Sequence, residues 1–134
     1  MLDGDALDER NHPMAMWTSQ ELNSLDRAHE IRVAGRRKDG SLRRLVIVWH
    51  VVADGALYVR SVNGTEGQWY KGVAGHYEGA ISWGDQTRNV SYTLDPSHEA
   101  EIEAAYAAKY GNSSATRAIT NETAKQTTLR IDPR

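Results

Sequence analysis

One stretch of the sequence gathers the residue types that bind an anionic, ring-containing ligand. Within residues 58–72, the segment 60–71 carries an arginine, a serine, two glycines, two aromatic residues and a lysine, in the order Arg60, Ser61, Gly64, Gly67, Trp69, Tyr70 and Lys71. Arginine binds phosphate through two parallel hydrogen bonds, and glycine lets backbone amides approach an anion. We therefore expect the arginine, the serine, the lysine and the amides beside the glycines to converge on one anion, with an aromatic residue stacked on a planar ring.

The same stretch also has a purely structural interpretation. Its glycines would serve the geometry of a loop, Arg60 would be solvated, and Trp69 would cover the end of a barrel. The sequence leaves both interpretations open.

Other kinds of chemistry find less support. The chain has no cysteine, which excludes disulfides, thiolate zinc sites and cysteine nucleophiles, and its five histidines show no ligand spacing, so we expect no metal. His50 and His76 are either acid–base groups or structural histidines. Ser61 lacks a nucleophile elbow, and no carboxylate pair is recognisable, so a hydrolase is disfavoured. We expect Trp49 and Trp83 to pack in the core.

Composition and charge describe an ordinary globular protein. The chain has 134 residues, 40% of them apolar and 25% charged. Its longest apolar run, residues 45–49, is too short to cross a membrane, and we expect a cytoplasmic protein with no membrane partner. Residues 1–15 read as a mobile tail before a single domain at 16–134, and Met14 or Met16 is an alternative start.

The charge is unevenly distributed along the chain. The net charge is −2, yet residues 32–60 carry seven bases and two acids. Such a segment either forms a solvated face or attracts a phosphate-bearing ligand or nucleic acid. Because the overall charge is near neutral and no binding motif is present, we expect no nucleic-acid partner.

The candidate site must be positioned by a series of short strands. Asp-Gly pairs at residues 39–40 and 54–55 predict hairpins, Thr18 with Glu21 predicts a capped helix, and Gly111 predicts a helix end. The predicted strands are 31–37, 42–52, 56–62, 77–83, 88–94 and 127–131, and the predicted helical segments are 19–29, 69–73, 95–110 and 115–122. Strands joined mostly by hairpins, with few intervening helices, indicate an α+β fold: a small antiparallel barrel of about six strands with two to three flanking helices.

The order of these motifs resembles the family catalogued as domain of unknown function 2255, over about residues 17–134. The resemblance is carried by residues along the whole chain: Trp17, Glu21, Leu22, Arg37, Asp39, Gly40, Trp49, Val51, Leu57 to Ser61, Gly64, Gly67, Trp69, Tyr70, His76 to Ile81, Ala105, Tyr106, Lys109 to Gly111, and Thr127 to Arg134. That family is in turn similar to split β-barrel proteins that bind FMN or the deazaflavin F420. The resemblance implies a split barrel and marks as cofactor contacts Arg60, Ser61, Gly64, Trp69, Tyr70 and Lys71, with Arg44 as a weaker basic neighbour.

Two functions remain open on this basis. The first is an oxidoreductase that depends on FMN or F420, in which the cofactor performs the chemistry and no catalytic side chain is identified. The alternative is a non-catalytic small-ligand-binding protein or a dimeric scaffold on the same barrel. A homodimer is expected because tryptophan-rich strands would otherwise expose apolar patches.

Overall fold

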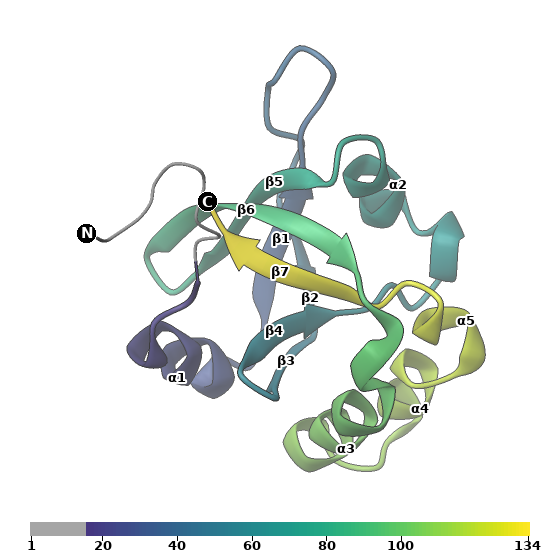
Figure 1. The fold of residues 1–134 in the computed structure, drawn as a ribbon. Coiled ribbons are helices and arrows are strands. Elements are labelled where there is room, and N and C mark those ends of the chain that lie inside the picture. The colour runs from purple at the N-terminus through teal and green to yellow at the C-terminus, as the bar shows by residue number, and fades with distance from the viewer. Residues whose placement is uncertain (1–15) are drawn as a thin grey trace.

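The protein forms a single seven-stranded antiparallel sheet surrounded by helices (Figure 1), in a computed structural model that describes residues 16–134. The strands are β1 (Ile31–Gly35), β2 (Val46–Val48), β3 (His50–Ala53), β4 (Ala56–Val59), β5 (Glu78–Trp83), β6 (Gln86–Leu94) and β7 (Leu129–Pro133). The helices are α1 (Ser19–Arg27), α2 (Gln68–Ala74), α3 (Glu99–Tyr110), α4 (Ser114–Ile119) and α5 (Glu122–Lys125), with 3₁₀ turns η1 (Gly64–Glu66) and η2 (Pro96–His98). The α+β barrel expected from the sequence is confirmed, and the tail expected at 1–15 lies outside the described residues.

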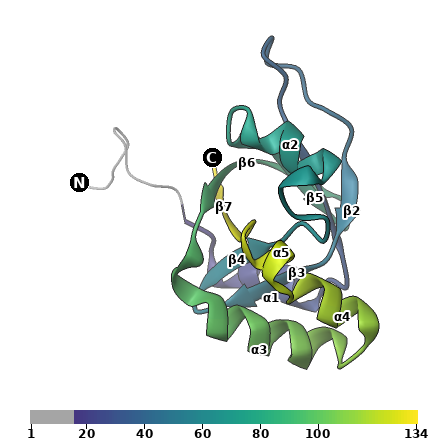
Figure 2. The ribbon, with the colours of Figure 1, turned by 90° about the vertical axis from the view of Figure 1, so that its right-hand side faces the viewer.

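The sheet curls into a nearly closed barrel because its two ends are joined by one residue. The strand order is β2-β1-β5-β6-β7-β4-β3, so β2 and β3 are the terminal strands, and yet only Trp49 separates them in the chain. The view in Figure 2 shows the strands arranged as a ring. A sheet whose ends share one continuous segment must bend back on itself, as strands do at barrel corners.

The predicted interior strand 42–52 is the main difference from the sequence analysis. It divides at Trp49 into β2 and β3, which raises the strand count from six to seven. In the described part of the chain β2 pairs only with β1, and Ile47 is therefore 51% exposed rather than buried between two strands. Residues 42–45 belong instead to a hairpin that projects from the barrel (Figure 1).

Two apolar clusters hold the fold together. The larger one fills the barrel, where alternate residues of each strand point inward, and includes Val33, Leu57, Val59, Ile81, Val90, Leu129 and Ile131. The smaller one lies between α3 and the outer face of β3 and β4, and consists of Val51, Ala53, Tyr58, Ile102, Tyr106 and Ile119. The core position expected for Trp83 is thereby confirmed.

The local signals in the sequence produce the expected ends of elements. Thr18 and Glu21 form the reciprocal capping box of α1, and Gly111 ends α3 with a φ of 81° that favours glycine. Asp95 caps Ser97, but the chain first makes the 3₁₀ turn η2, and α3 begins only at Glu99. None of the helices described is both long enough and apolar enough to cross a membrane.

Candidate functional site

A pocket of about 570 Å³ opens where the two ends of the sheet meet. One wall is β2 with Trp49, and the facing wall is the chain that leaves β4 at residues 60–63. The first turn of α2 and one side of α4 complete it. The lining residues are Val46, Ile47, Val48, Trp49, Arg60, Ser61, Val62, Asn63, Gly67, Gln68, Trp69, Ala115, Ala118 and Ile119.

The character of this pocket is apolar with a few polar groups at its edge. Nine of the fourteen lining residues are hydrophobic, including two tryptophans, and the polar side chains are mostly neutral. Pockets of this size and composition bind small ring-containing ligands, with a few polar groups that fix their orientation.

Trp49 is the best-supported aromatic surface of the pocket. The indole of this half-buried residue stacks on the Tyr110 ring, with centroids 4.0 Å apart and planes 4° from parallel. The Tyr110 hydroxyl lies 2.7 Å from the carbonyl oxygen of His29 and 3.0 Å from that of His50, and it accepts the His50 N–H at 3.1 Å. Burial raises the pKa of Tyr110 to about 12, so the hydroxyl stays protonated. Trp49 is therefore held in place from behind.

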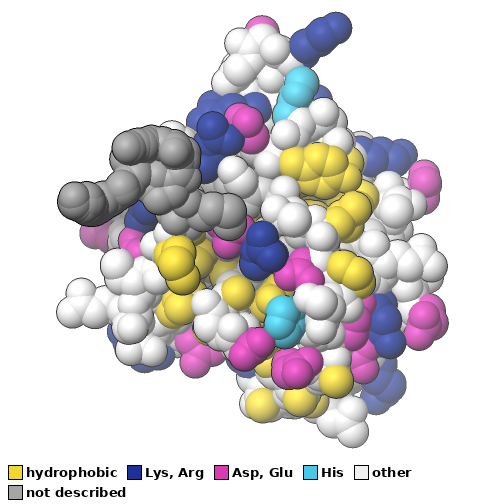
Figure 3. Space-filling view, viewed as in Figure 1, with side chains coloured by type: hydrophobic (Ala, Val, Ile, Leu, Met, Phe, Trp, Pro, Cys, Tyr) yellow, Lys and Arg dark blue, Asp and Glu magenta, His cyan; other side chains and the backbone are white. Residues whose placement is uncertain are grey.

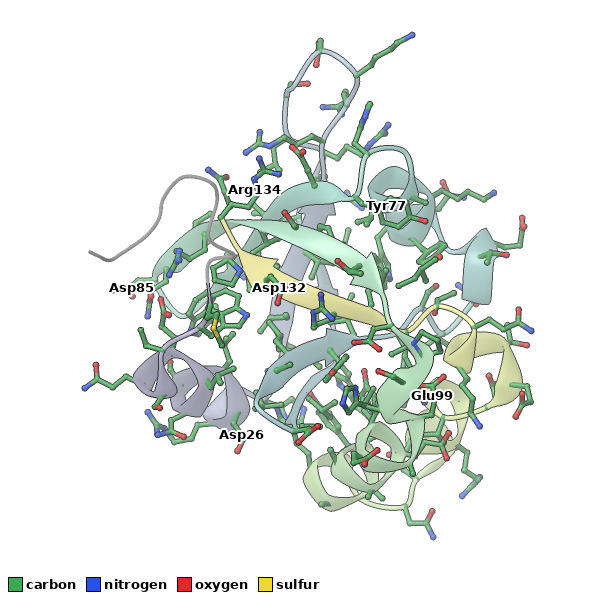
Figure 4. All side chains as sticks on the ribbon, in the orientation of Figure 1. Asp26, Tyr77, Asp85, Glu99, Asp132 and Arg134 are labelled. Atoms are coloured by element: carbon green, nitrogen blue, oxygen red, sulfur yellow. The ribbon has the colours of Figure 1, made fainter. Side chains whose placement is uncertain are left out.

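The side chain of Arg60 is fully buried and engaged by internal partners. Nε donates to Thr128 Oγ1 at 3.0 Å, Nη1 to the Ile119 carbonyl at 3.3 Å, and Nη2 to Glu99 Oε1 at 2.8 Å. Glu99, labelled in Figure 4, is the first residue of α3. Because the side chain has no exposed surface, the surface that Arg60 gives to the pocket comes from its backbone. Its predicted contact with a cofactor stays a prediction.

The loop after β4 is tightly built around its glycines. Ser61 is buried, its N–H donates to Thr127 Oγ1 at 2.8 Å, and its carbonyl accepts the N–H of Gly64 at 2.9 Å. A Cβ on Gly67 would overlap Ser61 Oγ, and Gly64 has a φ of 65° while packing against Thr123. Ser61 and Gly67 line the pocket, whereas Gly64 does not.

The remaining predicted contacts are divided between the pocket and its surroundings. Trp69 lines the pocket, but Tyr70 is buried in the barrel cluster, where burial and the neighbouring Tyr77 raise its pKa. Lys71 is exposed and pairs with Glu66 at 3.3 Å, and Arg44 is exposed on the projecting hairpin. Arg60, Ser61 and Trp69 are thus brought together, while Gly64, Tyr70, Lys71 and Arg44 lie outside the lining.

None of the histidines between residues 16 and 134 lines this pocket. His50 is fully buried, its Nε2 lies 2.6 Å from the Leu25 carbonyl, and burial lowers its pKa to about 4. His76 is exposed and lines no pocket described here. Among residues 16–134, no group of three or more histidine, aspartate or glutamate side chains is arranged to hold a metal.

Several lining residues were not foreseen from the sequence. Trp49 was expected in the core, and α4 contributes Ala115 and Ala118 from a segment that carried no chemical signal. Val62, Asn63 and Gln68 lie within the stretch that the sequence singled out, so their positions next to Arg60 and Trp69 were the available signal.

Comparison of the sequence with known families gives one match. The profile of a family described as "Uncharacterized protein conserved in bacteria (DUF2255)" matches residues 21–131. A search of curated protein sequences finds no match.

Solved structures share the fold at low sequence identity. The heme storage protein HutZ from Vibrio cholerae has a TM-score of 0.63 at 10% identity, covering 89% of this chain and 92% of its own. An F420 reductase has a TM-score of 0.54 at 14% identity, covering 84% and 91%. A FAD-binding protein from Mesorhizobium loti has a TM-score of 0.56 at 16% identity, covering 88% and 91%. At these identities the likeness extends to the split-barrel fold.

Proposed function

For this chain, which belongs to the uncharacterised bacterial family DUF2255, we propose a function from the geometry of the site. The protein binds a planar heteroaromatic cofactor, FMN or F420, in the pocket beside β2. The observation that carries the proposal is the Trp49 indole, which lines an apolar pocket of about 570 Å³ and is stacked from behind on Tyr110. A ring fixed in this way is ready to stack on a ligand, since aromatic pairs contribute about 0.5–1.5 kcal/mol beyond their burial.

The residues present fit the ring of such a cofactor. Trp49 and Trp69 supply aromatic surface, Val46 and Val48 supply an apolar wall, and Asn63 offers hydrogen bonds to ring heteroatoms. The fold is shared with an F420 reductase and a FAD-binding protein, which supports a ligand of this class. When bound, a flavin or deazaflavin supplies hydride-transfer chemistry, so that the protein would act as an oxidoreductase while this chain binds the ring and excludes water.

A non-catalytic ligand-binding protein or dimeric scaffold is the second candidate. It is favoured by two exposed apolar side chains of the pocket lining, since Ile47 is 51% and Val62 49% exposed. We propose that a second copy of the chain covers them in a homodimer, because a strand paired on one side only offers an edge for association. Sedimentation equilibrium tests this: the wild type is expected to be dimeric, and Ile47→Glu monomeric. A monomeric wild type would exclude the dimer.

Binding to the pocket can be tested by filling it from α4. Ala115 lines the pocket and is exposed, so Ala115→Trp would occupy the space without leaving a cavity. Ala108→Trp is the matched control, because Ala108 is an exposed residue of α3 outside the lining. We expect riboflavin, FMN or F420 fluorescence to report saturable binding to the wild type and Ala108→Trp, and no binding to Ala115→Trp. Binding that survives in Ala115→Trp would place the ligand elsewhere, and no binding of any of the three would overturn the proposal.

A further inference from the structure

The segment between β1 and β2 is a rigid, projecting ribbon rather than a loose loop. Residues 36–45 extend from the barrel (Figure 1), and the two arms are tied by backbone hydrogen bonds from Arg37 N–H to the Ser41 carbonyl at 2.8 Å and from Arg43 N–H to the Gly35 carbonyl at 2.9 Å. Asp39 closes the turn by accepting the N–H and the hydroxyl of Ser41. The backbone of this ribbon therefore follows a defined path.

The ribbon is strongly basic. It carries five cationic residues and one acid, and the cations are Arg36, Arg37, Lys38, Arg43 and Arg44. Figure 3 shows Lys and Arg side chains at the tip and around the base of this projection. Arg36 and Arg37 donate to oxygen atoms of the ribbon, and Arg36 also donates to Asn89. Within residues 16–134, Arg43 and Arg44 have no carboxylate at ion-pair distance.

The side chain of Arg43 lies against α2 at Gly72. A Cβ on Gly72 would lie 2.8 Å from Cδ and 3.2 Å from Nε of Arg43, so the absent side chain leaves the space for the arginine. Gly72 is three residues after Trp69, which places both on the same side of the helix, one turn apart. The guanidinium of Arg43 is thereby held next to the α2 wall of the pocket.

The short sequence distance between Arg43 and β2 also places Arg43 near the β2 wall of the pocket. Val46, the first residue of β2, lines the pocket and is only three residues after Arg43, a span of about 10 Å in extended chain. Arg43 is not part of the lining, but its backbone therefore lies within about 10 Å of the residue that begins the β2 wall.

Among the described residues, none supplies a free cation to the interior of the pocket. Arg60 is the only basic residue of that part of the chain in the lining, and its guanidinium is buried and bound to Glu99. An anionic group inside the pocket would therefore find no cationic side chain among the described lining residues to compensate for its lost hydration. A ligand that carries an anionic group therefore binds more favourably when this group stays at the rim of the pocket.

Resting on the ligand site proposed above, we propose that Arg43, seated on Gly72, binds the phosphate of a ligand whose neutral ring occupies the pocket, with Arg44 as a second cation beside it. The ligand class is thus a heteroaromatic ring with a phosphate ester on a flexible chain. Arg43 is not among the cofactor contacts that the family resemblance marks, which include Arg60 and, as a weaker neighbour, Arg44.

FMN and riboflavin test this because they differ only in the phosphate. Wild-type protein at low salt should bind FMN about tenfold more tightly than riboflavin, and the difference should shrink as salt is added, as a charge-assisted hydrogen bond predicts. Arg43→Gln should weaken FMN binding about tenfold and leave riboflavin binding unchanged. Gly72→Ala, which keeps the charge but displaces the arginine, should act in the same direction. Arg37→Gln is the matched control on the same ribbon and should change neither affinity.

The outcomes separate this proposal from the one on which it rests. If riboflavin and FMN bind equally tightly and Arg43→Gln changes neither, the phosphate site is overturned while the ring site stands. If neither compound binds, both proposals are overturned. If Arg37→Gln weakens FMN binding as much as Arg43→Gln does, the effect is the general charge of the ribbon, and the specific site on Gly72 is overturned.

Discussion

Tyr110 is the last residue of α3, and its ring supports Trp49, the residue that joins β2 to β3, at a centroid distance of 4.0 Å. The two residues are 61 positions apart in the chain, so helix α3 fixes the one point at which the sheet turns from its last strand to its first. The stack of Trp49 on Tyr110 is consequently formed by tertiary packing. Its contribution to the stability of the fold and its contribution to ligand binding can be measured separately by substitution.

Removal of the Tyr110 hydroxyl should affect stability more than binding. Tyr110→Phe keeps the stacked ring but leaves the N–H of His50 without its partner, which should lower the free energy of unfolding by about 1–2 kcal/mol. Tyr110→Leu removes the ring as well, and should weaken riboflavin binding several-fold. Urea denaturation and fluorescence titration measure the two effects. Equal riboflavin affinity in both variants would show that the stack does not support the ligand.

Loss of the buried arginine should be among the most destabilising single changes. Arg60→Met leaves Glu99 without its 2.8 Å partner, and the loss should be about 3 kcal/mol, the lower end for a buried pair, because the Glu99 side chain is 23% exposed. Adding Glu99→Leu removes the unpaired carboxylate and should restore part of the loss. Arg37→Met, at an exposed arginine, serves as the control and should leave the urea midpoint unchanged. A stable Arg60→Met protein would mean that the internal partners contribute little.

Two glycines should respond in opposite ways to the same substitution. A Cβ on Gly79 would overlap the Ala34 carbonyl in the paired strand β1, so Gly79→Ala should cost about 1–3 kcal/mol or more. Gly75 has a φ of −64° and nothing within 4 Å, so Gly75→Ala should be neutral or slightly stabilising. Thermal denaturation compares the two. Similar melting temperatures would contradict the close contact between β5 and β1.

Acid should destabilise the protein through His50. Its pKa is about 4 in the fold, below the usual 6.5, because burial disfavours the charged ring, and nearby Lys109 and His29 act in the same direction. Between these two values the unfolded chain binds the extra proton, so stability is fully present above pH 6.5 and falls towards pH 4. The loss is on the order of 3 kcal/mol. Urea midpoints at pH 7 and pH 5 should differ less in His50→Gln than in the wild type, and an unchanged difference would exclude His50 as the cause.

The sequence predicted the fold where the signal was local. Asp-Gly pairs at 39–40 and 54–55, the capping box of Thr18 and Glu21, and Gly111 each determine a turn or a helix end from neighbouring residues alone. The bend at Trp49 has no such signal, because it depends on β3 and β2 finding different partners. An unbroken apolar run therefore read as one strand.

The site shows the same limit. Ser61 and Trp69 were recognised because they stand in one short stretch that lines the pocket, but the burial of Arg60 depends on Glu99, Ile119 and Thr128, which are 39 to 68 residues away. Residue types alone do not show whether an arginine faces a ligand or a carboxylate of its own chain. The contact of the Arg43 side chain with Gly72 likewise depends on where α2 packs against the sheet.

The position of β7 has a consequence for how the protein is made. β7 is the last strand in chain order, yet it lies inside the sheet, between β6 and β4. Without residues 129–133 the sheet order leaves two separate groups of strands, β2-β1-β5-β6 and β4-β3, which the chain connects at Trp49 and through residues 60–77. Closure of the barrel must therefore follow translation of the first six strands, and until then the facing edges of β6 and β4 are open to pairing with another chain.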